Sequence, residues 1–345
     1  MGLAPVHDLL MPISSYYLIK RIAQMAAALI GASLVSFFIF RILPGDPVSL
    51  MVGPGVTEKY IAELRAYFRL DQPLIMQYFY WVADLLTLNL GTSFRYGTNV
   101  STLILERLPA TLELVFVSLF IGIGLGVLTG VVAATRRRAN MFLQGATIAG
   151  LAIPHFLWAT ILVVLFAAVL RLFPASGRVG LGVEIQTITG FYLIDSLITG
   201  NFEAFLNTLN HIALPAVSLA IGLTALIQRT LRSSMLDVLG EDYILTDRMK
   251  GHRESYIIFV RALKNALLPV ITLSGIQFTF LLGGSTVVEK IFGWPGMGNL
   301  LFTAVQYRDY TLVQGILMVY TFIAITTNFI VDVLYTYINP KVEYK

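Results

Sequence analysis

A stripe of polar side chains runs along one apolar stretch in the last quarter of the chain. Ser274, Gln277, Leu281 and Ser285 recur at spacings of three or four residues, with Phe278 beside them, so a helix places them on one face. In a membrane helix, polar side chains face protein or water rather than lipid. They would line a path across the membrane or form hydrogen bonds between helices, and both interpretations stay open.

A second group with chemical potential is the charged connector at residues 232–264, in which acidic and basic side chains alternate. Within it, residues 241–250 predict a short helix lying along the membrane, followed by Gly251 at its C-terminal turn. The charges complement the helix dipole, with Glu241 and Asp242 near the start and Arg248 and Lys250 near the end. This segment is either a solvated connector or a knob that docks into another protein.

Several kinds of chemistry are missing from the sequence. No phosphate-binding loop of the G-x-x-x-x-G-K-[ST] type is present, no Cys is present, and the four His residues show no metal-ligand spacing. Glu113 and Asp332 are acidic residues inside apolar stretches, but they lie near the ends and form no proton-relay chain. We therefore expect neither an enzyme nor a cofactor or metal site in this chain, and an ion-driven secondary transporter has little support.

The composition indicates a membrane protein. Of the 345 residues, 57% are hydrophobic and only 13% are charged, whereas soluble domains average about 25% charged residues. This balance excludes a typical soluble enzyme, a disordered chain and a nucleic-acid binder. The net charge of +4 is explained by Lys and Arg residues that orient the chain in the bilayer.

Six stretches are long and apolar enough to cross a membrane, which takes about 20 residues each. They are residues 22–43, 110–134, 144–173, 209–231, 267–288 and 312–338. A seventh stretch, 74–90, is short, polar in places and rich in aromatic residues, which predicts an interfacial or loop-packed helix. Gly122, Gly126 and Gly130 repeat every four residues, the pattern of closely packed membrane helices.

The distribution of Lys and Arg predicts the orientation. The run Arg136–Arg138 in a short connector is the strongest single indication of a cytoplasmic segment. Both chain termini and the 232–264 connector would then be cytoplasmic. We expect three parts: a first helix within residues 1–43, a small external helical cap at 44–109, and a five-helix core at 110–345.

The chain resembles the permease subunits of ABC importers in the dipeptide, oligopeptide and nickel branch, over nearly its full length. The resemblance rests on the order and spacing of several blocks: Pro44-Gly45-Asp46-Pro47, Asp71-Gln72-Pro73-Leu74, Arg107-Leu108-Pro109-Ala110-Thr111, Glu241-Asp242-Tyr243-Ile244 through Lys250-Gly251, Asn265-Ala266-Leu267-Leu268-Pro269, and Trp294-Pro295-Gly296. The chain departs from the family at Asp247, where a small residue is usual.

The resemblance implies an all-α membrane protein with six transmembrane helices, the type I ABC importer permease fold, in a bacterial inner membrane. It implies a second homologous permease, an external solute-binding protein, and two ATPase subunits that bind ATP and Mg. The residues it points to for ATPase coupling are Glu241, Asp242, Tyr243, Thr246, Arg248, Lys250 and Gly251. Peptides are the expected solutes, with nickel chelates or glutathione on the same scaffold, or a stand-alone secondary transporter, as alternatives.

Overall fold

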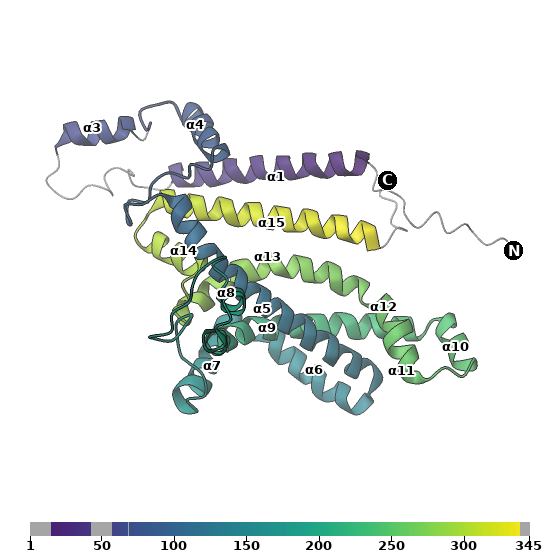
Figure 1. Cartoon of the computed structure of the whole chain (residues 1–345). Helices are drawn as coiled ribbons and strands as arrows, with labels where there is room; N and C mark the ends of the chain where they lie inside the picture. The colour runs from purple at the N-terminus through teal and green to yellow at the C-terminus, as the bar shows by residue number, and fades with distance from the viewer. Residues whose placement is uncertain (1–14, 43–56, 68, 339–345) are drawn as a thin grey trace.

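The computed structural model describes residues 15–42, 57–67 and 69–338, and helices dominate these ranges (Figure 1). Predictions that fall on the other residues, including the Pro44–Pro47 block, lie outside the described part. The long helices are α1 (Ser15–Ile42), α5 (Val100–Thr135), α9 (Phe202–Leu239), α13 (Leu268–Ile291) and α15 (Tyr310–Ile338). Shorter ones are α3 (Glu58–Tyr67), α4 (Leu74–Leu86), α6 (Arg137–Ala152), α7 (His155–Leu162), η2 (Val163–Val169), α8 (Tyr192–Ile198), α10 (Asp242–Met249), α11 (Glu254–Tyr256), η3 (Ile257–Ala262), α12 (Leu263–Ala266) and α14 (Met297–Gln306).

Within the described ranges, five helices are long and apolar enough to cross a membrane: α1, α5, α9, α13 and α15. The third predicted span, residues 144–173, is not one straight helix. It is a pair, α6 and then α7 with η2, bent by 105°. The bend follows from Pro154, which lacks an N–H and forces extended backbone on Ile153 before it. Counting the pair as one span gives the six that the sequence predicts.

The described helices extend beyond the predicted spans, most of all at α5 and α9. Helix α5 begins at Val100 rather than at residue 110, and α9 runs from Phe202 to Leu239 rather than from 209 to 231. Pro109 and Pro215 lie inside these helices without ending them. Because the apolar run marks only the part inside lipid, the polar ends of both helices escape a hydropathy search.

The glycine repeat of α5 packs directly on α9. A Cβ atom added at Gly122, Gly126 or Gly130 would meet Leu223, Ile227 or Leu231 respectively. Because both sets of numbers rise together, the two helices run in the same direction. The segment between them, which includes α6, α7 and η2, must therefore bring the chain back to the end of the bundle where α5 begins. The predicted topology requires the same return.

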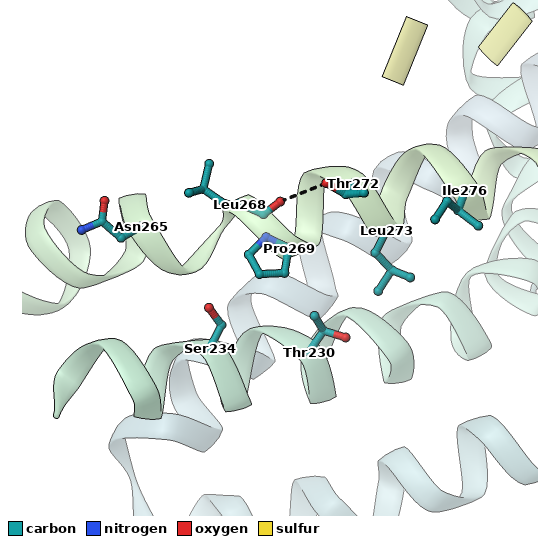
Figure 2. Close-up of a pocket in the computed structure, with 8 residues that line it drawn as sticks. All are labelled: Thr230, Ser234, Asn265, Leu268, Pro269, Thr272, Leu273 and Ile276. Atoms are coloured by element: carbon teal, nitrogen blue, oxygen red, sulfur yellow. Dashed lines mark hydrogen bonds between the residues drawn. The ribbon is translucent and has the colours of Figure 1, made fainter. Parts of the chain in front are cut away.

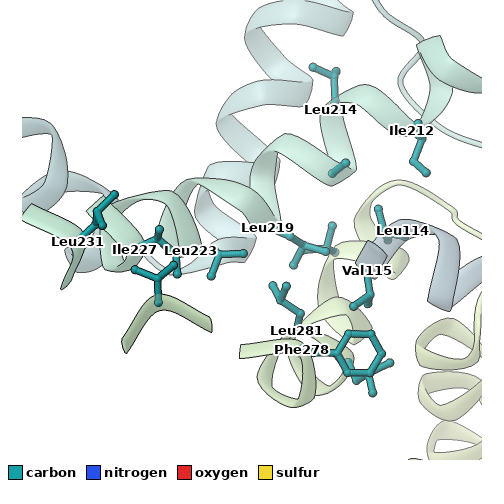
Figure 3. Packing of buried hydrophobic residues seen from close by; sticks show 14 of the residues in the cluster. Leu114, Val115, Ile212, Leu214, Leu219, Leu223, Ile227, Leu231, Phe278 and Leu281 are labelled. Carbon is teal, nitrogen blue, oxygen red and sulfur yellow. The ribbon is translucent and has the colours of Figure 1, made fainter. Parts of the chain in front are cut away.

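The core lies where α5, α9 and α13 meet. Figure 3 shows its apolar side chains interdigitating, among them Leu114, Leu219, Leu223, Phe278 and Leu281. Helices α1 and α15 form a second layer beside α13 (Figure 1). Arg21 of α1 and Asp332 of α15 form an ion pair of 2.8 Å. The start of α1, the end of α15 and α10 lie at one end of the bundle (Figure 1).

The helices of the predicted cap lie at the other end. Helix α4 is only 13 residues long and does not qualify as a span, as predicted for this aromatic stretch. It packs on the end of α1, where Tyr78 hydrogen bonds to Ser33 at 2.8 Å and contacts the ring of Phe37. Its other face is apolar and exposed.

Candidate functional site

Helix α10 is an exposed knob at the end of the bundle where α1 begins and α15 ends (Figure 1). It follows α9 after a turn at Gly240 and ends at Met249, with Lys250 as its C-cap. Gly251 then adopts φ +76°, a left-handed conformation that favours glycine and turns the chain sharply. The predicted helix at 241–250 is therefore present, at Asp242–Met249.

Two side-chain pairs anchor α10 to the elements behind it. The buried carboxylate of Asp247 accepts a 2.7 Å hydrogen bond from Nε of Arg261 in η3. This bond and the charge of Asp247 raise the pKa of Arg261 above its ordinary value. The Tyr243 hydroxyl accepts a 2.9 Å hydrogen bond from Nδ2 of Asn265 in α12. Asp247, the departure from the family pattern, thus has a structural partner in this chain.

The outward face of α10 differs from the one that the charge pattern suggested. Ile244 is fully buried, and Arg248 pairs with Glu254 at 2.9 Å. Two apolar residues, Leu245 and Met249, are 55% and 75% exposed and lie one helical turn apart. Sequence reasoning named the charges and missed this apolar pair, although its i, i+4 spacing was a signal.

The structure also shows the exposure of the other residues that were predicted to couple to the ATPase. Glu241, Asp242, Thr246, Lys250 and Gly251 are exposed on or beside α10. Tyr243 is half-buried and faces α12 rather than solvent. The predicted set therefore divides into an outward group and an anchoring group.

A groove of about 590 Å³ lies between α9 and α13, next to α12 (Figure 2). Thr230 and Ser234 line one wall, and Thr272 and Ile276 line the other, with Pro269 between them at the start of α13. Asn265 completes the groove at its α10 end. None of the residues that line it is charged, so the groove offers hydrogen-bonding groups among apolar surface.

The predicted polar stripe of α13 does not act as one surface. Phe278 is buried against Phe116, with ring centroids 5.3 Å apart, and Ser285 is buried and hydrogen bonds to Glu289. Ser274 is half-buried and bonds to the carbonyl of Val270 in its own helix. These three side chains are engaged within this chain.

Gln277 and Leu281 line a separate cavity of about 190 Å³ at the bend between α6 and α7. His155 and Pro154 from the bend, and Gly222 from α9, line the same cavity. A Cβ at Gly222 would come within 2.8 Å of the His155 ring, so this glycine makes room for the histidine. The groove of Figure 2 is therefore lined by neighbours of the predicted stripe rather than by the stripe itself.

The opposite end of the bundle is held by two buried carboxylates. Glu113 forms a 2.6 Å ion pair with Arg178, and the Arg178 guanidinium lies 3.6 Å from the centre of the Tyr192 ring. Glu289 accepts hydrogen bonds from the Thr111 hydroxyl at 2.7 Å and the Asn299 backbone N–H at 3.0 Å. These contacts tie the segments after η2 and after α13 to α5. The sequence offered no signal for the Glu113 pairing, because its partner lies far along the chain.

Asp195 orders the segment before α8. Its carboxylate accepts hydrogen bonds from the backbone N–H groups of Ile188, Thr189 and Gly190 and from the Thr189 hydroxyl. Burial raises the pKa of Asp195, but these bonds together hold it below its ordinary value.

Two family models cover most of the chain. The model of the binding-protein-dependent transport system inner membrane component matches residues 122–344, and the model of the N-terminal part of such membrane components matches residues 15–115. The chain belongs to this permease family.

Curated relatives agree with this membership. The chain is 40% identical over 334 residues to the di/tripeptide transport system permease protein DppB of Pseudomonas aeruginosa, covering 95% of this chain and 99% of the relative. It is 37% identical to the dipeptide permease DppB of Escherichia coli, again over 95% and 99%. It is 35% identical to the oligopeptide permease AppB of Bacillus subtilis, over 95% and 99%.

A solved structure shows the same fold. An inward-facing structure of the MetNI methionine ABC transporter aligns with a TM-score of 0.51 and 17% identity, over 69% of this chain and 96% of that chain. The family models and the relatives show that the permease is a multi-pass inner membrane component of a transport system rather than an enzyme, as the sequence predicts. It works with the other components of such a system.

Proposed function

We propose that this permease forms half of the translocation pathway of an ATP-driven peptide importer. A second homologous permease forms the other half, and an external binding protein delivers the solute. Two ATPase subunits bind ATP and Mg and grip the α10 region from the cytoplasm, where both termini also lie. The peptide class is supported by the names of the relatives, and the coupling role by the geometry of α10.

One observation carries the coupling proposal: Asn265 belongs to both α10's anchor and the groove. Its Nδ2 donates to the Tyr243 hydroxyl of α10, and the same residue lines the groove between α9 and α13. A displacement of α10 by an ATPase subunit therefore pulls on α12, at the start of the groove wall. The Asp247–Arg261 pair supplies a second connection, through η3.

The chemistry of the groove fits a peptide. Thr230, Ser234 and Thr272 present hydroxyl groups, and Leu273 and Ile276 present apolar surface. Peptides of varied sequence share a backbone of amide groups, so a path that carries them needs scattered polar contacts without a fixed charge. Weak contacts at several positions permit release. We propose that Thr272 and Ser234, rather than Ser274, Ser285 or Phe278, face the solute in this groove. Gln277 and Leu281 line the separate cavity at the α6–α7 bend.

The docking part is tested by truncating the exposed apolar pair of α10. Leu245→Ala combined with Met249→Ala should strongly reduce the ATPase that copurifies with the full complex, because two exposed anchors are lost. Leu236→Ala, at another exposed leucine near the end of α9, serves as the matched control. Undiminished copurification of the double variant would refute docking through this face.

The path is tested separately. Thr272→Trp should block uptake of a radiolabelled dipeptide in reconstituted vesicles while the ATPase still copurifies. Ile330→Trp, at an exposed position on α15 away from the groove, is the control. Normal dipeptide uptake by Thr272→Trp would show that the groove is not the path. Uptake of a nickel chelate instead of the dipeptide by the unaltered complex would refute the peptide assignment.

A further inference from the structure

A crevice of about 170 Å³ lies at the end of the bundle opposite α10, where α1, α4 and α15 meet. Arg41 from the last turn of α1 and Asp84 from α4 bring opposite charges into it. Asn89 and Gln314 add amide groups, and Trp81 and Tyr310 add aromatic surface. The proposed importer function uses none of these residues.

Arg41 has no acidic partner within ion-pair distance among the residues that the structure describes. Its guanidinium lies 5.1 Å from the centre of the Phe37 ring, and the residue is half-buried. Asp84 is paired only loosely, with Arg69 at 3.6 Å, whereas a tight charge-assisted bond is about 2.7–2.9 Å. The crevice therefore contains a cationic side chain and an anionic side chain, neither of which forms a short ion pair.

The depth of the crevice is that of lipid headgroups. Arg41 is the last residue of the apolar span Ile19–Arg41, and Tyr310 is the first of the span Tyr310–Val333. Aromatic residues gather at this level in membrane proteins, and α4 supplies them. The outer face of α4 exposes Ile75 and Phe79, which are 67% and 62% accessible. Such a face rests against acyl chains when a helix lies in the interface.

We propose that this crevice binds the headgroup of a phospholipid that carries a primary ammonium group, such as phosphatidylethanolamine. Arg41 holds the phosphate, for which the fork of the guanidinium is suited. Asp84 accepts the ammonium, and the exposed apolar face of α4 lies beside the acyl chains. The bound lipid fills the space between α1, α4 and α15 and fastens the cap to the bundle.

A long cationic side chain at a helix end can also reach headgroups without selecting among them. The crevice differs because a carboxylate lines the same space as the guanidinium. A carboxylate repels an anionic headgroup without an ammonium, such as phosphatidylglycerol. Headgroup preference is therefore the property that distinguishes a binding site from an unselective contact.

The test is native mass spectrometry of the full-length permease, purified with its copurifying subunits and equilibrated with equal amounts of phosphatidylethanolamine and phosphatidylglycerol of matched chains. We expect the permease to retain phosphatidylethanolamine in preference to phosphatidylglycerol. Arg41→Ala should lower its retention roughly tenfold to a hundredfold, the loss expected for hydrogen bonds to a charged group. Asp84→Asn should abolish the preference between the two lipids. Arg41→Lys should give intermediate retention, which also keeps the test usable if Arg41→Ala folds poorly.

Arg107→Ala is the matched control, because Arg107 is a half-buried arginine of α5 that does not line the crevice. It should leave both retention and preference unchanged. Equal retention of the two lipids by the unaltered permease would overturn the proposal, as would a loss with Arg107→Ala as large as with Arg41→Ala. Binding of O-phosphoethanolamine as tight as that of phosphatidylethanolamine would show that the acyl chains contribute nothing and would assign the crevice to a soluble ligand instead.

Discussion

Replacing Gly126 by Ala tests the packing that holds α5 against α9. A Cβ at this position would lie 2.6 Å from both Cβ and Cγ2 of Ile227, and 3.1 Å from the carbonyl oxygen of Thr224. The Cβ of Ile227 is fixed to its backbone, so no change of rotamer relieves the contact. The helices must separate, which we expect to cost about 1–3 kcal/mol, the usual range for overpacking a well-filled core.

The same helix provides the control. Gly124 has nothing within 4 Å of an added Cβ, so Gly124→Ala should be neutral or stabilising by up to about 1 kcal/mol from helix propensity. The stability of Gly130→Ala should lie between those of Gly124→Ala and Gly126→Ala, because the closest contact of a Cβ at Gly130 is Leu231 Cβ at 3.0 Å.

The assay is thermal denaturation of the detergent-purified permease, followed by loss of monodisperse protein on size-exclusion chromatography. The expected order of melting temperature is Gly124→Ala highest, Gly130→Ala next and Gly126→Ala lowest. Equal melting temperatures for Gly126→Ala and Gly124→Ala would refute the close packing of α5 on α9.

Three further results are expected. The native chain contains no Cys, so a single Cys at Thr98, an exposed residue of the predicted cap, should react with an impermeant maleimide from outside the cell. A single Cys at Arg137 should react only after permeabilisation, and external labelling at 137 would reverse the topology. Glu113→Ala should destabilise the permease by about 3–5 kcal/mol, because it leaves a buried guanidinium unpaired, and an unchanged melting temperature would contradict this. Gly251→Ala should destabilise the end of α10 by about 1–2 kcal/mol, because Gly251 has a φ of +76°, and it should reduce copurification of the ATPase. Gly240→Ala is the control, because Gly240 has a φ of −86°, and it should leave copurification unchanged. Equal effects of the two substitutions would contradict the argument from backbone conformation.

Much of the architecture was predictable because it depends on local rules. The bilayer demands long apolar helices, so α1, α5, α9, α13 and α15 are visible as hydrophobic runs. The glycine spacing in α5 predicted a close helix contact, and the alternation of charge around residues 241–250 predicted α10. Gly251 could be placed at the end of that helix because few residues other than glycine adopt its backbone conformation readily.

Other features depend on which helices become neighbours, and the sequence pattern carries no such information. A helical wheel places Ser285 on the polar stripe of α13 and Phe278 beside it. In the structure, the approach of α5 buries Phe278, and Ser285 hydrogen bonds to Glu289 in its own helix. The ion pair of Glu113 with Arg178 joins residues far apart in the chain.

The sequence by itself determined the class of the protein, the number of membrane crossings and the existence of the α10 knob. Only the tertiary structure decided which face of α10 is free, because that depends on Asp247 and Tyr243 finding Arg261 and Asn265 behind them. It also decided that the uncharged groove lies between α9 and α13, since a groove is formed by two helices and neither sequence segment specifies its partner. The 105° bend at Pro154 belongs between these cases: proline predicts a weak point, and the packing of the neighbouring helices decides the angle.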